Sequence, residues 1–432
     1  MKKVYYQLKM YQKSPLRVGS GDNEITDSDL MMDGRGCPFI PGSSVAGVLR
    51  DLCVNTVSSL SENDVNKLFG DISEGSLLES HVLVSDAAGP KTAAASDYKV
   101  TIRDGIRLDE WGMTVHGNKY DFQVTETKIP YYSVLEWSGT EEEYQKEIIK
   151  GLDLLMKNLV FDGISFGART TRGYGKMSVT VKRIAYDFPE DLGKWLDFDP
   201  LEEDSFANGT DMIAESQENT LIKICADIKI EGSFSVRVNT ARAERFSDGS
   251  VPDSVPLCNS EEKPVIPGTS WAGVFRHHML ALLRHLRLND EEKDRNQEVN
   301  HLFGMGENGG ESIRSAIRFS ETVISGGASC SLTRNAVDRF TQAPRNTALF
   351  TNRLWQGGQG RLEIVIEKNK WNKLHLQLLA VSLMDLDLGI LSFGGAAGTG
   401  HGRCSVTGLT VNGENKTSWI KEKNIHFLEE FL

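Results

Sequence analysis

The chain has 432 residues, of which 39% are hydrophobic and 25% are charged, and its formal net charge is −12. This length and composition are typical of a soluble protein with two or three domains, and no apolar run approaches the roughly 20 residues that a membrane-spanning helix needs. The negative net charge argues against a protein covered in nucleic acid, because phosphate binding needs clustered Lys and Arg. The six cysteines form no CxxC pair and fit no zinc spacing, so we expect reduced thiols and a cytoplasmic protein.

The first predicted element is a strand over KVYYQLKMYQ, residues 3–12, because apolar and polar residues alternate there. The segment lacks the apolar core of a signal peptide. An aspartate-rich loop follows. A helix is predicted from PGSSVAGVLRDLCVNTVSSL, residues 41–60, with Ser43 or Ser44 as its N-cap.

A second helix, EEEYQKEIIKGLDLLMKNL, precedes the glycine-rich stretch SFGARTTRGYGKMSV at residues 165–179. A glycine-rich turn lets backbone amides approach an anion closely, and Arg169, Arg172 and Lys176 could then hold a phosphodiester backbone. The alternative is a tight connection between helix and strand that needs small residues. The pattern GxxxxGK[ST] is absent and the glycines follow a helix, which disfavours a nucleotide-hydrolysing enzyme.

Three segments of the first half return in the second half in the same order. FIPGSSVAGVLR at residue 39 returns as VIPGTSWAGVFR at residue 265, with eight of twelve positions identical, and NKLFG at residue 66 returns as NHLFG. The glycine-rich stretch returns as SFGGAAGTGHGRCSV at residues 392–406, with seven of fifteen identical. We infer a tandem duplication with domains at residues 1–189 and 220–432, joined by an acidic linker at residues 190–219.

The second half repeats the predicted order of elements. A strand over LIKICADIKIEGSFSVRV precedes a helix at WAGVFRHHMLALLRHL, for which Thr269 or Ser270 would be the N-cap. A later helix, NKWNKLHLQLLAVSLMDLDL, leads into the second glycine-rich stretch and a closing strand. The order strand, helix, strands, helix, strand predicts an α+β protein with two ferredoxin-like domains.

These motifs resemble the RAMP superfamily of CRISPR-associated proteins. IPGSSVAGVLR, followed by a terminal FGARTTRGYGK, is similar to paired motifs of that superfamily. The intervening residues 101–137, TIRDGIRLDEWGMTVHGNKYDFQVTETKIPYYSVLEW, are similar to a section of the backbone subunits of type III effector complexes. A chain with two such units resembles the fused backbone subunits of type III-D systems.

The resemblance implies an RRM-like fold that holds a CRISPR guide RNA, with complementary target RNA and other effector subunits as partners and no membrane. Each unit would insert a β-hairpin thumb that kinks the guide, within about residues 105–126 and 335–358. Trp111 and Trp355 could wedge against bases there, although a buried core tryptophan is an equal alternative for each.

The motifs and the resemblance together indicate a set of RNA-binding candidates in both halves. Since Arg169 and Arg172 are replaced by Ala396 and Thr399 in the second copy, equal RNA contact by both halves is in doubt. The candidates are Ser43, Ser44, Arg50, Arg103, Gly167, Arg169, Arg172, Gly173, Lys176, Thr269, Ser270, Arg276, Arg334, Gly394, Gly395, Gly400, His401 and Arg403.

In the same family an Asp shortly before the IPGSS motif cuts the paired target RNA with a divalent metal. Asp27 and Asp253 each lie thirteen residues before the Ile of that motif, so the resemblance implies that they are catalytic and bind Mg²⁺ or Mn²⁺. The chemistry is attack of the RNA 2′-hydroxyl on the adjacent phosphate. Asp22 and Asp248 keep the same register, whereas solvated turn residues are the alternative for all four.

Three other functions stay open at this point. The chain could be a scaffold that holds guide RNA without cutting. It could be a guide-maturing endoribonuclease, but such enzymes usually employ His, and His277, His278 and His285 have no partner in register between the halves. A small-molecule enzyme is disfavoured because no cofactor motif appears.

Overall fold

The structure is a computed structural model that describes residues 1–21, 24–73, 76–109, 114–140, 147–214, 221–238, 251–286, 292–308 and 311–431. The chain forms two compact units. The first comprises Met1–Ile102, Asp121–Thr170 and Tyr174–Glu218, and the second comprises Arg103–Tyr120, Thr171–Gly173 and Asn219–Leu432. The second unit therefore contains two short segments of the first sequence repeat.

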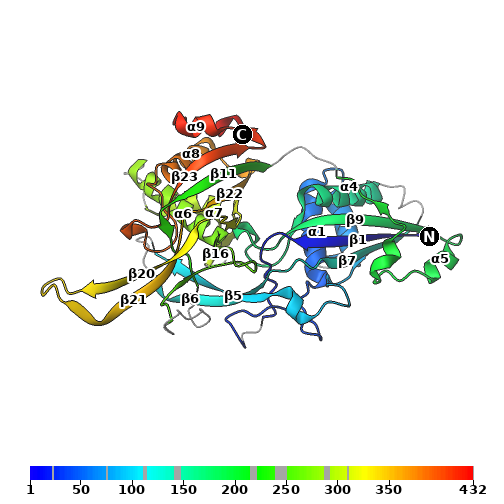
Figure 1. The fold of residues 1–432 in the computed structure, drawn as a ribbon. Coiled ribbons are helices and arrows are strands. Elements are labelled where there is room, and N and C mark those ends of the chain that lie inside the picture. The colour runs from blue at the N-terminus through cyan, green and yellow to red at the C-terminus, as the bar shows by residue number, and fades with distance from the viewer. Residues whose placement is uncertain are drawn as a thin grey trace. The chain divides into compact units, whose positions relative to one another are not determined.

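The first unit is built on an antiparallel sheet with the strand order β10–β9–β1–β7–β4, in which β8 also pairs with β9 (Figure 1). Its strands are β1 (Lys2–Gln12), β4 (Val82–Val84), β7 (Tyr131–Gly139), β8 (Ile164–Ser165), β9 (Lys176–Asp187) and β10 (Thr210–Asp211). Its helices are α1 (Gly42–Thr56), α2 (Glu62–Phe69), α4 (Glu147–Asp162) and α5 (Leu192–Leu196), and a short hairpin joins β2 (Asp71–Ser73) to β3 (Ser76–Leu78).

Helices α1 and α4 pack on one face of this sheet. Val45, Leu49 and Cys53 are spaced four residues apart, so they form one buried stripe along α1. They join alternate residues of β1, such as Tyr6 and Leu8, in one core cluster. The 3.6-residue period of the helix and the two-residue period of the strand each place apolar side chains on one face, and the core lies between the facing sides of α1 and β1.

The opposite face of the same sheet is covered by the segment that the sequence predicts as a linker. Tyr5 of β1 points to this face, where its ring lies 5.0 Å from that of Phe198 and its hydroxyl accepts a hydrogen bond from the indole of Trp195 at 2.9 Å. Phe206 is 1% exposed in the same cluster. Residues 190–211 are therefore folded onto the sheet, because their aromatic side chains complete a second small core.

The second unit has a sheet with the order β18–β22–β11–β23–β24. These strands are β11 (Leu221–Glu231), β18 (Ile317–Phe319), β22 (Gln359–Glu367), β23 (Arg403–Val411) and β24 (Glu414–Asn415). The helices are α6 (Gly268–Leu286), α7 (Glu292–Phe303), α8 (Lys373–Asp387) and α9 (Thr417–Lys421). Short two-stranded pairs complete it: β13 (Arg237–Val238) with β14 (Val255–Pro256), β15 (Val265–Ile266) with β19 (Thr322–Val323), and β16 (Met305–Asn308) with β17 (Glu311–Ile313).

The outward face of the second sheet is charged. Along β11 the apolar residues face the helices, whereas Asp227 faces outward and forms an ion pair with Arg361 of β22 at 2.7 Å. Lys223 pairs with Glu363 at 3.0 Å on the same two strands. The two sheets thus differ: one outer face is aromatic and covered, and the other carries solvated ion pairs.

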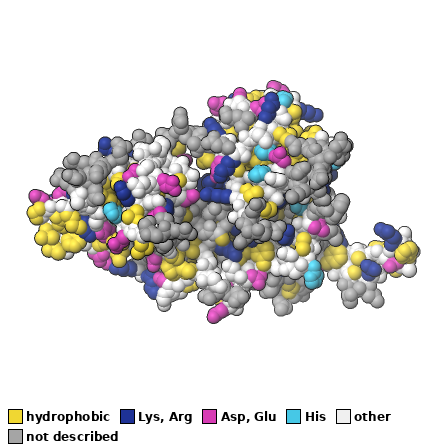
Figure 2. All heavy atoms as spheres, turned by 180° about the vertical axis from the view of Figure 1, so that it is seen from behind, with side chains coloured by type: hydrophobic (Ala, Val, Ile, Leu, Met, Phe, Trp, Pro, Cys, Tyr) yellow, Lys and Arg dark blue, Asp and Glu magenta, His cyan; other side chains and the backbone are white. Residues whose placement is uncertain are grey.

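Two long hairpins lie where the sequence predicts thumbs. The first joins β5 (Val100–Leu108) to β6 (Thr114–Thr125). The second joins β20 (Ala328–Val337) to β21 (Pro344–Gln356), and β21 also pairs with the short strand β12 (Ser233–Phe234). The outer part of the second hairpin carries exposed basic and apolar side chains (Figure 2), among them Arg339, Phe340 and Arg345. Their role as thumbs stays a prediction.

Both units are mixed α/β, as the sequence predicts, while the ferredoxin-like assignment stays a prediction. The predicted N-caps are wrong by two to three residues. Helix α1 begins at Gly42 with Pro41 as its N-cap, and Asp86 accepts the hydrogen bond of the Gly42 amide at 2.7 Å. The first-turn amide is thus bonded to a side chain that follows strand β4 and is distant in sequence, which the local sequence does not reveal.

Candidate nucleic-acid interface

The two glycine-rich stretches fold into the same turn. In the first glycine turn (residues 166–175) the Phe166 amide donates to the Gly175 carbonyl at 3.0 Å, and in the second glycine turn (residues 393–402) the Phe393 amide donates to the Gly402 carbonyl at 3.0 Å. A Cβ on Gly175 would lie 1.8 Å from the Phe166 carbonyl oxygen. The invariance of this glycine between the copies therefore has a steric cause.

Several amides of these turns are already bonded to backbone carbonyls. The Ala168 amide donates to the Arg17 carbonyl at 2.8 Å, and its counterpart Gly395 donates to the Ser235 carbonyl at 2.6 Å. Gly175 donates to the Pro15 carbonyl at 2.7 Å. These glycines serve the tight-turn alternative, so the case for anion binding rests on the side chains around the turns.

Around the first glycine turn two guanidinium groups stack on one aromatic ring. The Arg17 and Arg169 guanidinium carbons lie 4.4 and 4.9 Å from the centre of the Phe122 ring. Tyr174 contacts the same ring edge-on, with centroids 6.0 Å apart. Phe122 is 1% exposed, so it is a rigid platform that holds both cations at the turn.

The second glycine turn has a different polar arrangement. The His401 ring nitrogen Nδ1 lies 2.7 Å from the Ser233 hydroxyl, and its Nε2 contacts the Arg334 guanidinium, which also donates to the Thr399 hydroxyl at 3.3 Å. Burial, followed by the charges of Arg334 and Arg237, lowers the pKa of His401. A neutral His401 therefore accepts from Arg334 and orients this cation at the turn.

The predicted catalytic residue Asp27 is exposed and bonded to strand β6. Its carboxylate accepts a hydrogen bond from the Asp121 amide at 2.9 Å, and its own amide donates to the Asp121 carboxylate at 3.0 Å. Asp121 directly precedes Phe122, the platform of Arg17 and Arg169. Asp27 bonds to Asp121, and Arg169 of the first glycine turn stacks on Phe122. The aspartate and the turn therefore contact adjacent residues of strand β6.

Asp253 occupies the matching place in the second repeat. Its carboxylate accepts a hydrogen bond from the Thr351 amide of β21 at 2.6 Å, and its amide donates to the Thr351 carbonyl at 2.8 Å. The neighbouring residue Phe350 pairs in register with Arg334, which contacts the second glycine turn. Asp253 and this turn therefore also converge at one hairpin.

The two aspartate sites differ in their second carboxylate. Asp121 lies beside Asp27, whereas Thr351 lies beside Asp253. Carboxylates suit Mg²⁺ and Mn²⁺, and Mg²⁺ is often held by one or two of them together with water and substrate phosphates. Asp27 and Asp121 fit that pattern, although the described residues contain no group of three His, Cys, Asp or Glu that could hold a metal ion.

Asp29 shapes the loop that carries Asp27. Its carboxylate accepts hydrogen bonds from the amides of Glu24, Ile25 and Thr26, each at 2.9 Å, and from the Thr26 hydroxyl at 2.8 Å. These hydrogen bonds lower the pKa of the Asp29 carboxyl, and the bond from the Ile25 amide has the largest effect. Asp22 and Asp248, which share the register of Asp27 and Asp253, lie outside the described residues.

Some predicted RNA-binding residues have structural contacts. Arg50 donates to the Gly70 carbonyl at 2.9 Å, and Arg276 donates to the Gly304 carbonyl at 3.1 Å. The Arg103 guanidinium is 2% exposed in an ion pair with Glu321. These arginines hold loops and strand ends in place, which differs from the predicted RNA contact.

The remaining candidates are placed as follows. Ser43 and Ser44 are exposed in the first turn of α1, and Thr269 and Ser270 are half-buried in the first turn of α6. The Trp355 indole donates to the Gly326 carbonyl at 3.0 Å at the base of its hairpin and packs against the core, which favours the core alternative. Gly167, Gly394 and Gly400 are exposed, Gly173, Gly395 and Lys176 are half-buried, and Arg403 is exposed on β23, while Trp111 lies outside the described residues.

Sequence reasoning misses Arg17, Asp121 and Phe122. Arg17 stands alone between two predicted elements, and Asp121 and Phe122 lie in a stretch that the repeat does not match by identity. Their roles depend on which strand the glycine turn contacts. A signal does exist for Phe122, because Tyr120, Phe122 and Val124 alternate with polar residues, which predicts that they share one face of the strand.

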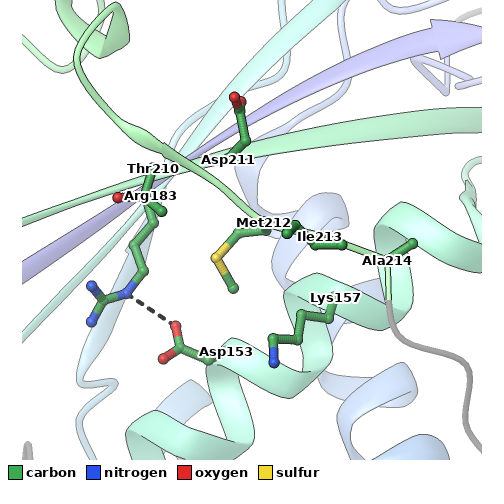
Figure 3. Close-up of a pocket in the computed structure, with 8 residues that line it drawn as sticks. All are labelled: Asp153, Lys157, Arg183, Thr210, Asp211, Met212, Ile213 and Ala214. Atoms are coloured by element: carbon green, nitrogen blue, oxygen red, sulfur yellow. Dashed lines mark hydrogen bonds and ion pairs between the residues drawn. The ribbon is translucent and has the colours of Figure 1, made fainter.

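A pocket elsewhere in the first unit contains none of the predicted residues. It is lined by α4, β9, β10 and the three residues that follow β10. The Arg183 guanidinium donates to the Asp153 carboxylate at 3.1 Å at its wall (Figure 3). Asp153 also accepts from the buried Tyr6 hydroxyl at 2.5 Å. This network joins helix α4 to the sheet, so it is accounted for by packing.

Comparison with known proteins agrees with the duplicated architecture. The model of the RAMP superfamily matches residues 9–178 and 247–405, one region in each repeat. The chain therefore belongs to the RAMP superfamily and contains two of its units. No curated protein matches the chain, and none of the helices in its described residues is both long and apolar enough to cross a membrane.

Proposed function

We propose that the protein is a backbone subunit of a CRISPR effector complex of type III-D kind, which binds guide RNA through both repeats. One observation carries this proposal: in each repeat a glycine turn, a cationic side chain and an exposed aspartate converge at the same long hairpin. In the first repeat these are Arg169 and Asp27, and in the second they are Arg334 and Asp253. A repeated cationic site suits a repeating polymer such as the RNA backbone.

The exposed aspartates suit cleavage of a target RNA paired to that guide. The RNA 2′-hydroxyl attacks the adjacent phosphorus as its proton passes to the Asp27 or Asp253 carboxylate. The bond to the 5′-oxygen breaks and this oxygen takes a proton from water, which leaves a 2′,3′-cyclic phosphate and a 5′-hydroxyl. A divalent cation held by Asp27 and Asp121 would stabilise the charge that develops on the phosphate.

RNA binding is tested by fluorescence anisotropy of labelled guide RNA over a range of salt concentrations. We expect Arg169→Ala to weaken binding and to reduce the salt slope by about 0.7, the value for one phosphate contact with a single strand. Alanine fits the turn, because Ala396 takes the same left-handed conformation at the matching place, with φ of 62° against 64° for Arg169. Lys194→Ala, an exposed change on the covering segment, is the control.

Cleavage is tested with a labelled target RNA in the assembled complex. We expect Asp27→Asn and Asp253→Asn each to remove one cut by at least about a hundredfold, the usual range for general-base removal, while target binding persists. Asn keeps the acceptor for the Asp121 or Thr351 amide, so the loop should stay folded. Equal cutting by all variants would leave a guide-RNA scaffold without nuclease activity of its own.

A further inference from the structure

In the second unit, a surface beside the start of α6 holds an arginine from the first glycine turn. Arg172 donates to the Phe303 carbonyl at 2.6 Å and to the Ser315 hydroxyl at 3.4 Å. A Cβ on Gly268, the first residue of α6, would lie 2.3 Å from the Arg172 carbonyl oxygen. Residues Thr171–Gly173 and this helix start, which belong to the same unit, therefore fit closely together.

A second arginine reaches the same surface from the first hairpin. Arg103 forms an ion pair with Glu321, and the two side chains are 2% and 8% exposed. Gly173 lies against the same strand end, where an added Cβ would meet the Glu321 amide at 2.7 Å. The surface is thus built from a helix start, a carbonyl, a hydroxyl and an acid, and it takes two arginines and a glycine.

The first repeat contains the same surface. Ser80 donates to the carbonyls of Leu68 and Val82 at 2.8 and 2.7 Å, as Ser315 donates to those of Leu302 and Ile317 at 3.1 and 2.7 Å. Phe69 precedes Gly70 as Phe303 precedes Gly304 in the repeated LFG motif.

The acid has a counterpart as well. Asp86 precedes Ala87, which bridges to Ile40, and Glu321 precedes Thr322, which pairs with Ile266. We name Gly42, Phe69, Ser80 and Asp86 the acceptor surface.

The acceptor surface differs from its counterpart in what it holds. Asp86 is exposed, whereas Glu321 is nearly buried by Arg103. Within the described part of the chain, no arginine side chain bonds to Asp86, Ser80 or the Phe69 carbonyl. One copy of the surface therefore holds two arginines, whereas the other holds none among the described residues and leaves Asp86 exposed.

We propose that the acceptor surface binds a different protein chain of the same superfamily, one that presents an arginine in a glycine turn. This inference rests on the proposed function, since it names a partner for the assembly. A second copy of this chain fits poorly, because its remaining glycine turn has Thr399 where the first has Arg172. The partner must therefore be a protein that has an arginine at this position of its glycine turn.

The chain itself provides a probe, because Thr399→Arg restores the missing arginine. In sedimentation velocity without RNA, we expect the wild-type chain to stay monomeric. Thr399→Arg should self-associate at least about tenfold more tightly, the effect of one charge-assisted hydrogen bond. Asp86→Lys added to this variant should abolish the association, and Asp86→Asn, which keeps the acceptor for the Gly42 amide, should weaken it.

Thr407→Arg is the matched control, since Thr407 is exposed on β23 outside the turn. If Thr399→Arg associates no more than this control, or associates regardless of Asp86, the acceptor surface is overturned. If the wild-type chain already self-associates and Asp86→Lys prevents it, a second copy is the partner and the proposal of a different chain is overturned. Because RNA is absent, a failure of guide binding leaves this result unaffected.

Discussion

At the scale of single residues, the two repeats place an aspartate alike and surround it differently. Asp27 and Asp253 each accept a backbone amide of a hairpin strand. Beside them stand Asp121 in one repeat and Thr351 in the other. A second carboxylate raises the local negative charge and so favours a divalent cation, which makes the first repeat the better candidate for metal-dependent cleavage.

His401 makes stability depend on pH at the second glycine turn. Its pKa is lowered in the folded protein from the ordinary value of 6.5, so the folded state resists its protonation. The stability that His401 contributes is present above pH 6.5 and is lost as the pH falls through the lower folded-state pKa. We predict that Tm falls less between about pH 8 and pH 5 in His401→Gln than in the wild type.

The control for this prediction is His285→Gln, because the exposed His285 hydrogen-bonds to the Ala281 carbonyl of its own helix and lies outside the second glycine turn. It should reproduce the wild-type pH profile. An unchanged profile for His401→Gln would show that His401 titrates alike in the folded and unfolded states.

At the scale of elements, two glycines of α1 differ in whether a side chain would fit, so they distinguish a steric requirement for glycine from its low helix propensity. A Cβ on Gly42 would lie 2.4 Å from the Val84 carbonyl oxygen, whereas Gly47 in the same helix has nothing within 4 Å. We predict that Gly42→Ala costs about 1–3 kcal/mol of stability by overpacking. Gly47→Ala should gain about 1 kcal/mol, since alanine is the better helix former. Chemical denaturation of both variants measures the difference, and equal values would contradict the close approach of α1 to β4.

The covering segment of the first sheet is a second element that stability can test. Phe206 is 1% exposed in the cluster that contains Tyr5, and its ring lies 5.3 Å from that of Phe198, so Phe206→Ala should cost about 3–5 kcal/mol. Leu196→Ala on the same segment is the control, because Leu196 is 68% exposed and should change stability little. A neutral Phe206→Ala would mean that residues 190–211 are the linker that their acidic composition predicts.

The sequence predicts the helices and strands better than it predicts which residues they contact. The duplication, the strands and the helices follow from periodicity and from matched motifs. The cover on the first sheet was hidden because the run Val4-Tyr5-Tyr6 breaks the alternation in one strand, while the aromatic residues that meet it lie near residue 200 in an acidic stretch. The sequence predicts Arg103 as an RNA ligand because its acidic partner, Glu321, lies more than two hundred residues away.

At the scale of the whole molecule, a net charge of −12 must be reconciled with the proposed role as a guide-RNA subunit. Acidic residues are concentrated in the segment that covers the first sheet, whereas Arg17 and Arg169 meet at the first glycine turn and Arg334 lies at the second. Local cations steer a polyanion even when the total charge is negative. The second turn has fewer of them, so the two repeats should hold RNA unequally.

The most direct test of the central claim is photo-crosslinking of guide RNA in the assembled complex, followed by identification of the crosslinked peptides. The account predicts crosslinks to both glycine turns, residues 166–175 and 393–402, at guide positions separated by a constant number of nucleotides. Crosslinks to the first turn should be the stronger and should fall in Arg169→Ala. Crosslinks confined to surfaces away from both turns would contradict the account.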